Sequence, residues 1–176
     1  MNEPWTIPNS PWKDEKAYLN WLRGSIRRIW SRHPVKIAYK QSRRYKAPVG
    51  RNGKGVFVSD CEVCGKQSRD CQVDHLRGGY GFTDWNSFTD WARMILWVGF
   101  DDIQEVCVEC HEVINLGQRM GVSLEIASYH KIAIDLQKKK LDKEWLASKG
   151  VVAAKTKDAR REQIVELLRE EKESEG

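Results

Sequence analysis

The sequence predicts an α+β fold in which a small core with short strands lies between helical segments at the two ends of the chain. Apolar residues recur at helical spacing before Pro34 and again beyond Gly121. Two strand-like runs, Val56–Val58 and Cys71–Val73, lie between those segments. Two Cys-x-x-Cys pairs bracket the second run, which indicates that the middle of the chain folds around one local site.

Length and composition indicate a soluble globular protein. The 176 residues suffice for one modest core with extensions or for two small units. Of these residues 40% are hydrophobic and 31% are charged, no apolar run approaches the length of a membrane span, and the N-terminus carries no basic and apolar signal. We therefore expect a cytoplasmic protein, in which thiols stay reduced and Cys-x-x-Cys pairs bind a metal rather than form disulfides.

Charge is distributed unevenly along the chain. Residues 1–59 carry 13 Lys and Arg against 3 acids, residues 60–118 carry 4 against 11, and residues 119–176 carry 13 against 11. The net charge of +5 thus hides a basic first segment beside an acidic second one. This asymmetry indicates a partner-binding arm attached to a core that binds cations. An ordinary solvated acidic surface is the alternative for the second segment.

The basic first segment is predicted to begin with a helix. The helix is expected to start at Ser10, with a proline at its first helical position, and to be interrupted by Pro34. No acid occurs over residues 18–59, and aromatic residues are interleaved with the cations of this run. Residues 50–55 are expected to form a flexible turn before the first strand.

Helices are also predicted after the second strand-like run. A glycine-containing loop over residues 78–81 is expected to be mobile and to lead into a helix that is capped by Thr83 and ends near Trp97. The buried side of this helix is predicted to carry Trp85, Phe88, Trp91 and Ile95. Gly150 is expected to end the second of three further helices, and the Glu-rich tail is expected to be frayed. These helices are predicted near residues 123–139, 141–149 and 157–172.

The four paired cysteines predict a structural zinc site. Two intervening residues allow both sulfurs of a Cys-x-x-Cys pair to face one ion, so two pairs complete a tetrahedral site. The predicted ligands are Cys61, Cys64, Cys107 and Cys110. Gly65 suits the tight turn after the first pair, and the unpaired Cys71 is expected to be a small buried side chain. A redox dithiol and unligated thiols are the alternatives.

Four short motifs follow one another between residues 61 and 111. They are Cys61-x-x-Cys64, Val73-Asp74-His75, Ile103-Gln104 and Cys107-x-x-Cys110-His111. Together they resemble an HNH endonuclease of the ββα-metal type, of which zinc-bearing phage HNH enzymes and junction resolvases of the endonuclease VII type are the most similar members. The resemblance covers about a third of the chain. It implies a ββα-metal core at residues 56–118, between a basic, Trp-rich helical arm at residues 1–55 and a C-terminal helical region at residues 119–176.

The resemblance implies hydrolysis of DNA phosphodiester bonds with one divalent ion. His75 would be the general base that takes a proton from the attacking water, a role that suits a neutral imidazole with an ordinary pKa of about 6.5. Asp74 and His111 would ligate Mg²⁺ or Mn²⁺, and Asn115, one helical turn past His111, is an alternative or additional ligand. Neighbours on a regular strand point to opposite faces, so Asp74 and His75 can share a site only if their strand ends or bends there.

The chain departs from the family pattern at three places. The middle Asn of the family falls at Asp102, which can still accept hydrogen bonds from nearby backbone amides as Asn does. Ile114 stands where the phage enzymes often carry a Lys after the last cysteine. The segment between His75 and Cys107 is longer than in the resolvase type, which argues against junction resolution by analogy.

The basic arm is predicted to bind DNA. Beside a nuclease motif, a long acid-free run favours contacts with phosphates over a merely solvated cationic helix face. The interleaved aromatic residues are expected to pack the arm onto the core. The residues predicted to contact DNA are Arg27, Arg28, Arg43, Arg44, Lys46 and Arg51. Of these, Arg43, Arg44 and Lys46 are favoured because they lie close to the predicted zinc-binding segment.

The sequence thus predicts an endodeoxyribonuclease with one structural Zn²⁺ and a catalytic Mg²⁺ or Mn²⁺. It would nick or cut duplex DNA as a monomer or homodimer, without association with membranes, and in the cytoplasm of a bacterial host if it is encoded by a phage. A zinc-dependent DNA-binding module without catalysis is the alternative, in which Asp74-His75 is a surface pair and His111 caps its helix or ligates the zinc. A thiol redox protein is a third alternative, and it would keep its function without zinc.

Overall fold

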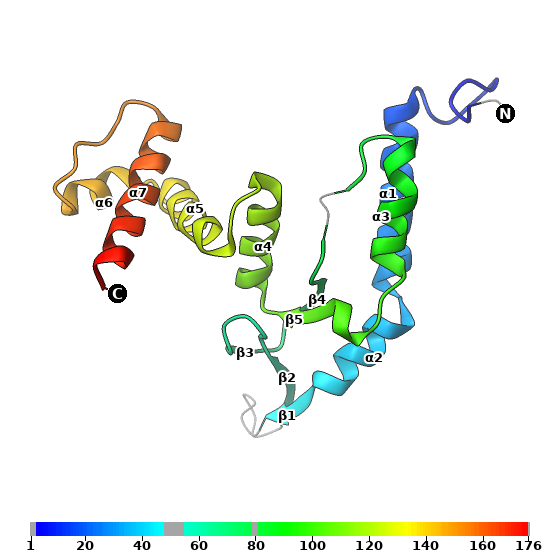
Figure 1. Cartoon of the computed structure of the whole chain (residues 1–176), viewed down its shortest axis with the longest axis horizontal. Helices are drawn as coiled ribbons and strands as arrows, with labels where there is room; N and C mark the ends of the chain where they lie inside the picture. The colour runs from blue at the N-terminus through cyan, green and yellow to red at the C-terminus, as the bar shows by residue number, and fades with distance from the viewer. Residues whose placement is uncertain (1–2, 48–54, 79–80, 176) are drawn as a thin grey trace. The chain divides into compact units, whose positions relative to one another are not determined.

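The computed structural model describes residues 3–47, 55–78 and 81–175, and the chain divides into two compact units, residues 1–111 and 112–176. Figure 1 labels the helices and strands of both units. The predicted basic arm and most of the predicted core belong to the first unit. In the described part of the chain, no helix is both long enough and apolar enough to cross a membrane.

Two consecutive helices open the first unit, α1 (Glu15–Ser31) and α2 (Pro34–Arg43). The predicted interruption at Pro34 is confirmed, because Pro34 occupies the first turn of α2. The predicted start at Ser10 is wrong. Asp14 caps α1 instead, with its Oδ1 accepting from the Ala17 amide at 2.7 Å, whereas the Ser10 hydroxyl is engaged in local bonds outside any helix. An Asp whose side chain reaches the third residue of the helix thus caps it better than the upstream Ser.

The strands of the first unit are short and antiparallel. One sheet has the order β1-β2-β3, and the other pairs β4 with β5. Their bounds are β1 (Tyr45–Ala47), β2 (Val56–Asp60), β3 (Gln67–Ser68), β4 (Gln72–His75) and β5 (Ile103–Val106). Both predicted strands are present, although β2 continues to Asp60 and β4 begins one residue later and continues to His75. Most of the predicted turn at 50–55 and the middle of the predicted loop at 78–81 lie outside the described residues.

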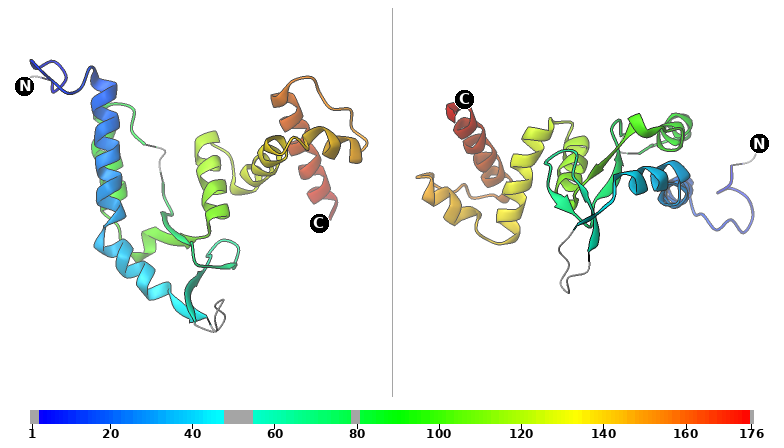
Figure 2. Two further views of the ribbon diagram at one scale, coloured as in Figure 1. Left: turned by 180° about the vertical axis from the view of Figure 1, so that it is seen from behind. Right: turned by 90° about the horizontal axis from the view of Figure 1, so that it is seen from below.

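Helix α3 (Trp85–Leu96) packs along α1, as the two views in Figure 2 show. The buried residues at this contact are Leu19, Phe82 and Trp91. The helix is capped by Asp84 rather than by Thr83, because the Asp84 carboxylate accepts from the Ser87 amide at 2.9 Å and completes a capping box. The prediction that Trp85 is buried is wrong, since 53% of its surface is exposed.

A second small core joins α2 to the β4–β5 pair. Its buried members are Tyr39, Val73 and Ile103. Lys40 extends this contact, because its Nζ donates to the Cys71 carbonyl at 2.9 Å. A single 3₁₀ turn, η1 (Phe100–Asp102), leads into β5, and α4 (Val108–Met120) begins two residues after β5 ends. Strand pair and helix therefore follow one another with almost no connecting chain.

The second unit is helical. It contains the C-terminal part of α4 together with α5 (Leu124–Lys138), α6 (Asp142–Ser148) and α7 (Lys157–Glu175), close to the three predicted helices. Gly150 follows α6 with a φ of +74°, so the predicted stop is confirmed. The predicted fraying of the tail is wrong. Helix α7 reaches Glu175, and its last turns are held by ion pairs of Lys149 with Glu171 and of Lys172 with Glu125.

Candidate functional site

The structure brings the four predicted zinc ligands together. Cys61 directly follows β2 and Cys107 directly follows β5, while Cys64 lies in the turn after Cys61 and Cys110 lies in the first turn of α4. All four sulfurs lie within 4.8 Å of one another, and the Cys64 and Cys107 sulfurs are 3.8 Å apart. Zn–S bonds of about 2.3 Å in a tetrahedron place sulfurs about 3.8 Å apart. The cluster could therefore hold one metal ion, and a structural zinc is compatible with its dimensions.

Local backbone geometry shapes both cysteine turns. Gly65 adopts a φ of +70°, as its predicted role in a tight turn requires, and its amide donates to the Cys61 carbonyl at 2.8 Å. In the second turn, the Cys110 amide points at the Cys107 sulfur at 3.4 Å. The Glu62 amide donates to the Glu105 carbonyl at 2.9 Å and so ties the first turn to β5. The backbone thus directs the sulfurs toward one point.

Thiol acidity differs within the cluster. Burial acts to raise the pKa of Cys61, but donors from nearby backbone amides outweigh it and lower that pKa to about 7. Burial raises the pKa of Cys107 and of Cys110. Burial also raises the pKa of Cys71 to about 11. Cys71 is 1% exposed and its Sγ lies 3.6 Å from the Ser59 carbonyl, so the predicted role as a small buried residue is confirmed.

Asp74 and His111 face one another beside the cysteine cluster. Asp74 belongs to β4 and His111 to the first turn of α4, and the Asp74 Oδ1 lies 3.9 Å from the His111 Nε2. The other carboxylate oxygen, Oδ2, is buried and has no hydrogen-bond partner among the described residues. Two ligands of one Mg²⁺ or Mn²⁺ ion, each about 2.1 Å away, can be at most about 4.2 Å apart. The distance from Oδ1 to Nε2 lies within this span, although Oδ1 also accepts from the His75 amide at 2.9 Å. Oδ2 is the carboxylate oxygen left without a donor, so Asp74 could offer it to a cation.

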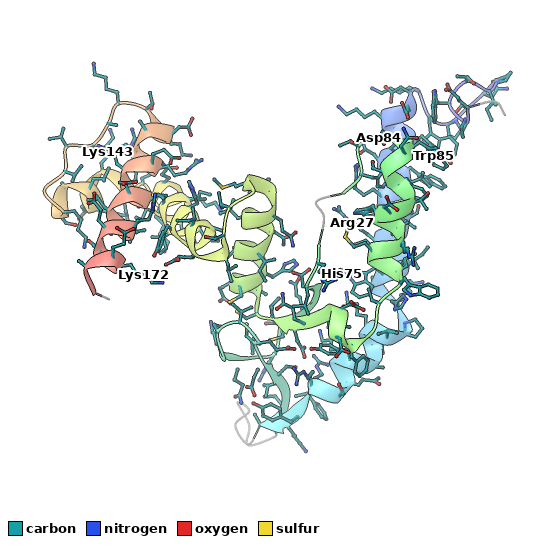
Figure 3. All side chains as sticks on the ribbon, in the orientation of Figure 1. Arg27, His75, Asp84, Trp85, Lys143 and Lys172 are labelled. Atoms are coloured by element: carbon teal, nitrogen blue, oxygen red, sulfur yellow. The ribbon has the colours of Figure 1, made fainter. Side chains whose placement is uncertain are left out.

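His75, labelled in Figure 3, follows Asp74 in β4. Its side chain is 6% exposed, and its ring lies against the Trp30 indole with 4.2 Å between ring centroids. Its Nε2 lies 3.1 Å from the Ile95 carbonyl oxygen. A carbonyl oxygen can only accept, so Nε2 carries the hydrogen and the neutral ring keeps its lone pair on Nδ1. Burial lowers the pKa of His75, although the Ile95 carbonyl and the Asp74 charge act in the opposite direction.

Asp102 organises the end of β4. The β4–β5 register pairs His75 with Ile103, and the Leu76 amide then donates to the Asp102 carbonyl at 2.9 Å. The Asp102 Oδ2 accepts from the Gly99 amide at 2.8 Å, which confirms that Asp at this position bonds a nearby backbone amide. Strand β4 contains both Asp74 and His75, with Val73 and His75 buried and Asp74 half-buried, so the sharing of one site by Asp74 and His75 stays a prediction.

The residues predicted to bind DNA are found in different settings. Arg27, Arg28, Arg44 and Lys46 are exposed in the first unit, and Figure 3 labels Arg27 on α1. Arg43 is engaged instead. Its Nη2 lies 3.0 Å from the Glu62 Oε2 and its guanidinium lies 5.5 Å from the Tyr39 ring centroid. Arg51 lies outside the described residues, and Asn115 lies four residues past His111 on α4, in the second unit.

Two residues of this site were not expected from the sequence, Trp30 as the ring that packs on His75 and Lys36 as a cation near Asp74. The Lys36 Nζ lies 5.1 Å from the Trp30 ring centroid. Burial, followed by the nearby charge of Lys40, lowers the pKa of Lys36, while Asp74 acts to raise it. The sequence feature that bears on their placement is Pro34. It breaks the helix between Trp30 and Lys36 and so allows the chain to change direction between them.

Comparisons with known proteins leave the family of the chain open. Any function must therefore be argued from the chain's own residues, above all from Asp74, His75, His111 and the four clustered cysteines. The chain matches no protein-family model, no curated protein and no solved structure.

Proposed function

We propose that the chain is a metal-dependent endonuclease of the HNH type, which hydrolyses phosphodiester bonds of DNA and uses zinc only to hold its fold. One observation carries the proposal. A buried carboxylate with an unpartnered oxygen lies 3.9 Å from a histidine nitrogen, on a strand whose next residue is a histidine held by a backbone carbonyl. A hard-cation ligand pair and an oriented base are the two components that hydrolysis of a phosphodiester requires.

In the proposed reaction His75 accepts the proton of the attacking water at Nδ1. The water oxygen forms a bond to phosphorus, and the bond from phosphorus to the leaving strand end breaks. The leaving oxygen then takes a proton from solvent. The Ile95 carbonyl supports the base, because its bond to Nε2–H fixes the tautomer and strengthens as the ring becomes positive.

Asp74 and His111 would hold Mg²⁺ or Mn²⁺ by one carboxylate oxygen and one imidazole nitrogen. When bound, the ion would supply positive charge to a non-bridging phosphate oxygen and to the leaving oxygen. Lys36 adds a cation on the same side as Asp74 and Trp30, and the exposed Arg27 and Arg28 of α1 are available to neighbouring phosphates. Zinc in the cysteine cluster would fix β5 against the first cysteine turn, and thereby the distance from β4 to α4.

The test is cleavage of supercoiled plasmid with Mg²⁺ or Mn²⁺ by the wild type and by Asp74→Asn. Asparagine keeps the shape of the side chain but removes the charge that would bind the cation. We expect cleavage to fall at least about 100-fold, which is the usual scale for loss of a catalytic group. The matched control is Asp90→Asn, at an exposed acid of α3 that is not one of the proposed ligands, and this variant should cut like the wild type.

His75→Ala completes the experiment, with zinc content and circular dichroism as measures of folding. A folded His75→Ala protein that cuts at the wild-type rate would show that the base is misassigned. If Asp74→Asn cut DNA at the wild-type rate, Asp74 would not be a ligand of the catalytic ion. If the wild type cuts neither duplex nor branched DNA but binds it with zinc present, the non-catalytic DNA-binding module is correct instead.

A further inference from the structure

Charge in the second unit is segregated between its two ends. Residues 119–176 are nearly balanced as a whole, but residues 138–161 carry 9 Lys and Arg against 3 acids. Residues 162–176 carry 2 against 6. The basic stretch covers the end of α5, all of α6 and the first turn of α7, and the acidic stretch is the remainder of α7. One end of this unit is therefore strongly cationic.

Four of the nine cations of residues 138–161 line a hollow of about 380 Å³. Its walls carry the side chains of Gln137, Lys140, Asp142, Lys143, Lys157 and Arg160. The three lysines are exposed, and none of them forms an ion pair with a described carboxylate. The single acid, Asp142, is 6% exposed and is paired with Arg160 at 2.6 Å. The three lysines that line the hollow thus carry positive charges that no described carboxylate neutralises in an ion pair.

Hydrogen bonds hold the segments of the hollow in place. Gln137, 7% exposed, donates from its Nε2 to the Lys157 carbonyl at 2.6 Å and so ties α5 to the start of α7. Arg160 donates from its Nε to Asp142 and from its Nη1 to the Ala154 and Lys155 carbonyls at 3.0 and 2.9 Å. Because these bonds order the backbone, the lysines converge without a further rearrangement of the chain.

We propose that this lysine-lined hollow, formed by Lys140, Lys143 and Lys157, binds the phosphate backbone of duplex DNA and is a second DNA-binding surface of the chain. Phosphates of a duplex are closely spaced and are bound by lysines with release of counterions. A membrane-binding surface would instead need large apolar or aromatic side chains on the same face. The exposed large apolar residues of the described segment 139–157 are Leu141 and Val152, and neither is aromatic. The proposal does not depend on cleavage by the first unit.

The test is the affinity of the full-length protein for a labelled 20-bp duplex, measured by fluorescence anisotropy against salt concentration without added Mg²⁺ or Mn²⁺. The variant is Lys140→Gln/Lys143→Gln/Lys157→Gln. At 0.1 M salt we expect its Kd to rise by about tenfold or more, and the salt slope to fall by about 0.9 for each lysine that contacts a phosphate.

The matched control, Lys149→Gln/Arg169→Gln/Lys172→Gln, removes the same charge from cations that are paired with glutamates. Figure 3 shows Lys143 and Lys172 well apart in this unit. The control should bind DNA within about twofold of the wild type, because exposed charged side chains that contact no phosphate contribute little to the affinity. If both triple variants bound DNA equally weakly, the loss of affinity would reflect net charge alone and the proposal would be overturned. Unchanged DNA affinity of the first variant would also overturn it.

A second experiment with lipid vesicles distinguishes binding of DNA from binding of a lipid surface. Sedimentation with vesicles containing 30% phosphatidylserine should be weak and equal for the wild type and both triple variants. Loss of vesicle binding in the first variant with unchanged DNA affinity would assign the hollow to anionic lipid instead. Circular dichroism melting of each variant confirms that the helices are intact. Plasmid cleavage is read separately, so a failure of the proposed nuclease activity and a failure of this surface are distinguishable.

Discussion

The two compact units of the chain are stabilised in different ways. In residues 1–111 the described strands are 2 to 5 residues long, and the buried side chains include two separate clusters of three residues each. Other buried residues of this unit include Val58, Cys71 and Val106. In residues 112–176 no cysteine occurs, and five buried apolar residues form one core between α5, α6 and α7. Small cores bury too little apolar surface to be stable alone, and metal ligands can supply the difference. The comparison therefore predicts that the stability of the first unit depends on its cysteines and that the stability of the second does not.

Replacement of one cysteine should have the largest effect and should be confined to the first unit. Cys107→Ser removes a ligand that is 1% exposed, and zinc binding, worth on the order of 10 kcal/mol, is coupled to folding. We expect loss of the bound zinc and unfolding around the cysteine cluster. Zinc analysis and tryptophan fluorescence measure this, because seven of the eight tryptophans belong to residues 1–111.

The control for that experiment is Cys71→Ser, at a cysteine that is equally buried but lies outside the cluster. This variant should keep one zinc per chain, since a serine hydroxyl can donate to the Ser59 carbonyl as the thiol does. Zinc-free Cys107→Ser protein with wild-type fluorescence would contradict the dependence of the first unit on metal.

Shortening a buried side chain in the core of the second unit should leave the zinc content of the protein unchanged. Leu146 is fully buried at 0% exposure, and Leu146→Ala should destabilise that unit by about 2–5 kcal/mol. Val152→Ala is the matched control, because Val152 is 89% exposed and its truncation should change stability by less than about 0.5 kcal/mol. Thermal melting followed by circular dichroism measures both. A fall in zinc content in the leucine variant would show that the two units do not fold separately.

The Asp142–Arg160 pair should make the second unit sensitive to acid. The hydrogen bond from Arg160 lowers the pKa of Asp142, although burial opposes it. The carboxylate therefore adds stability above its unfolded pKa of about 3.9, and this contribution disappears as pH falls through the lower pKa of the folded state. Asp142→Asn should cost about 3 kcal/mol at pH 7 and should reduce the loss of stability between pH 5 and pH 3. An unchanged pH dependence in this variant would contradict the role of the pair.

The smallest effect is expected at the ion pair between the two cysteine turns. The Lys66 Nζ lies 3.2 Å from the Glu109 Oε1, but the two side chains are 60% and 69% exposed. Exposed ion pairs contribute at most about 1 kcal/mol. Lys66→Ala should therefore leave zinc content unchanged and lower the melting temperature of the first unit only slightly. A large loss of zinc affinity would show that this charge pair, rather than the sulfurs alone, sets the dimensions of the cluster.

Local features of this chain could be predicted from its sequence. The cysteine cluster is encoded by spacing within each pair, and Gly65 and Gly150 adopt the backbone conformations expected of them. The helices of the second unit follow from apolar periodicity. Element starts were less accurate, because Asp14 and Asp84 compete with Ser10 and Thr83 as caps and only the final hydrogen bonds decide between them.

Contacts between distant segments could not be predicted. His75 is held by the Ile95 carbonyl and the Trp30 ring, and neither has a pattern that points to β4. Trp85 was expected to be buried because it shares a helix face with Trp91, but it stays 53% exposed although its ring stacks on Phe88. The ion pair of Arg43 with Glu62 was also not expected, because no sequence pattern links the two residues. Such contacts depend on the packing of whole elements. The predicted contact of Arg43 with DNA stays a prediction.

The near absence of a connection between β5 and α4 has an evolutionary consequence. Residues 103–111 supply the strand partner of His75, two of the four clustered cysteines and His111 within nine consecutive positions. Each residue added to a helix turns the following side chains by about 100°. One inserted or deleted residue in this stretch would therefore misalign the sulfurs, the strand register and His111 together. Descendants of this chain should vary freely in the length of other connections while keeping this interval constant.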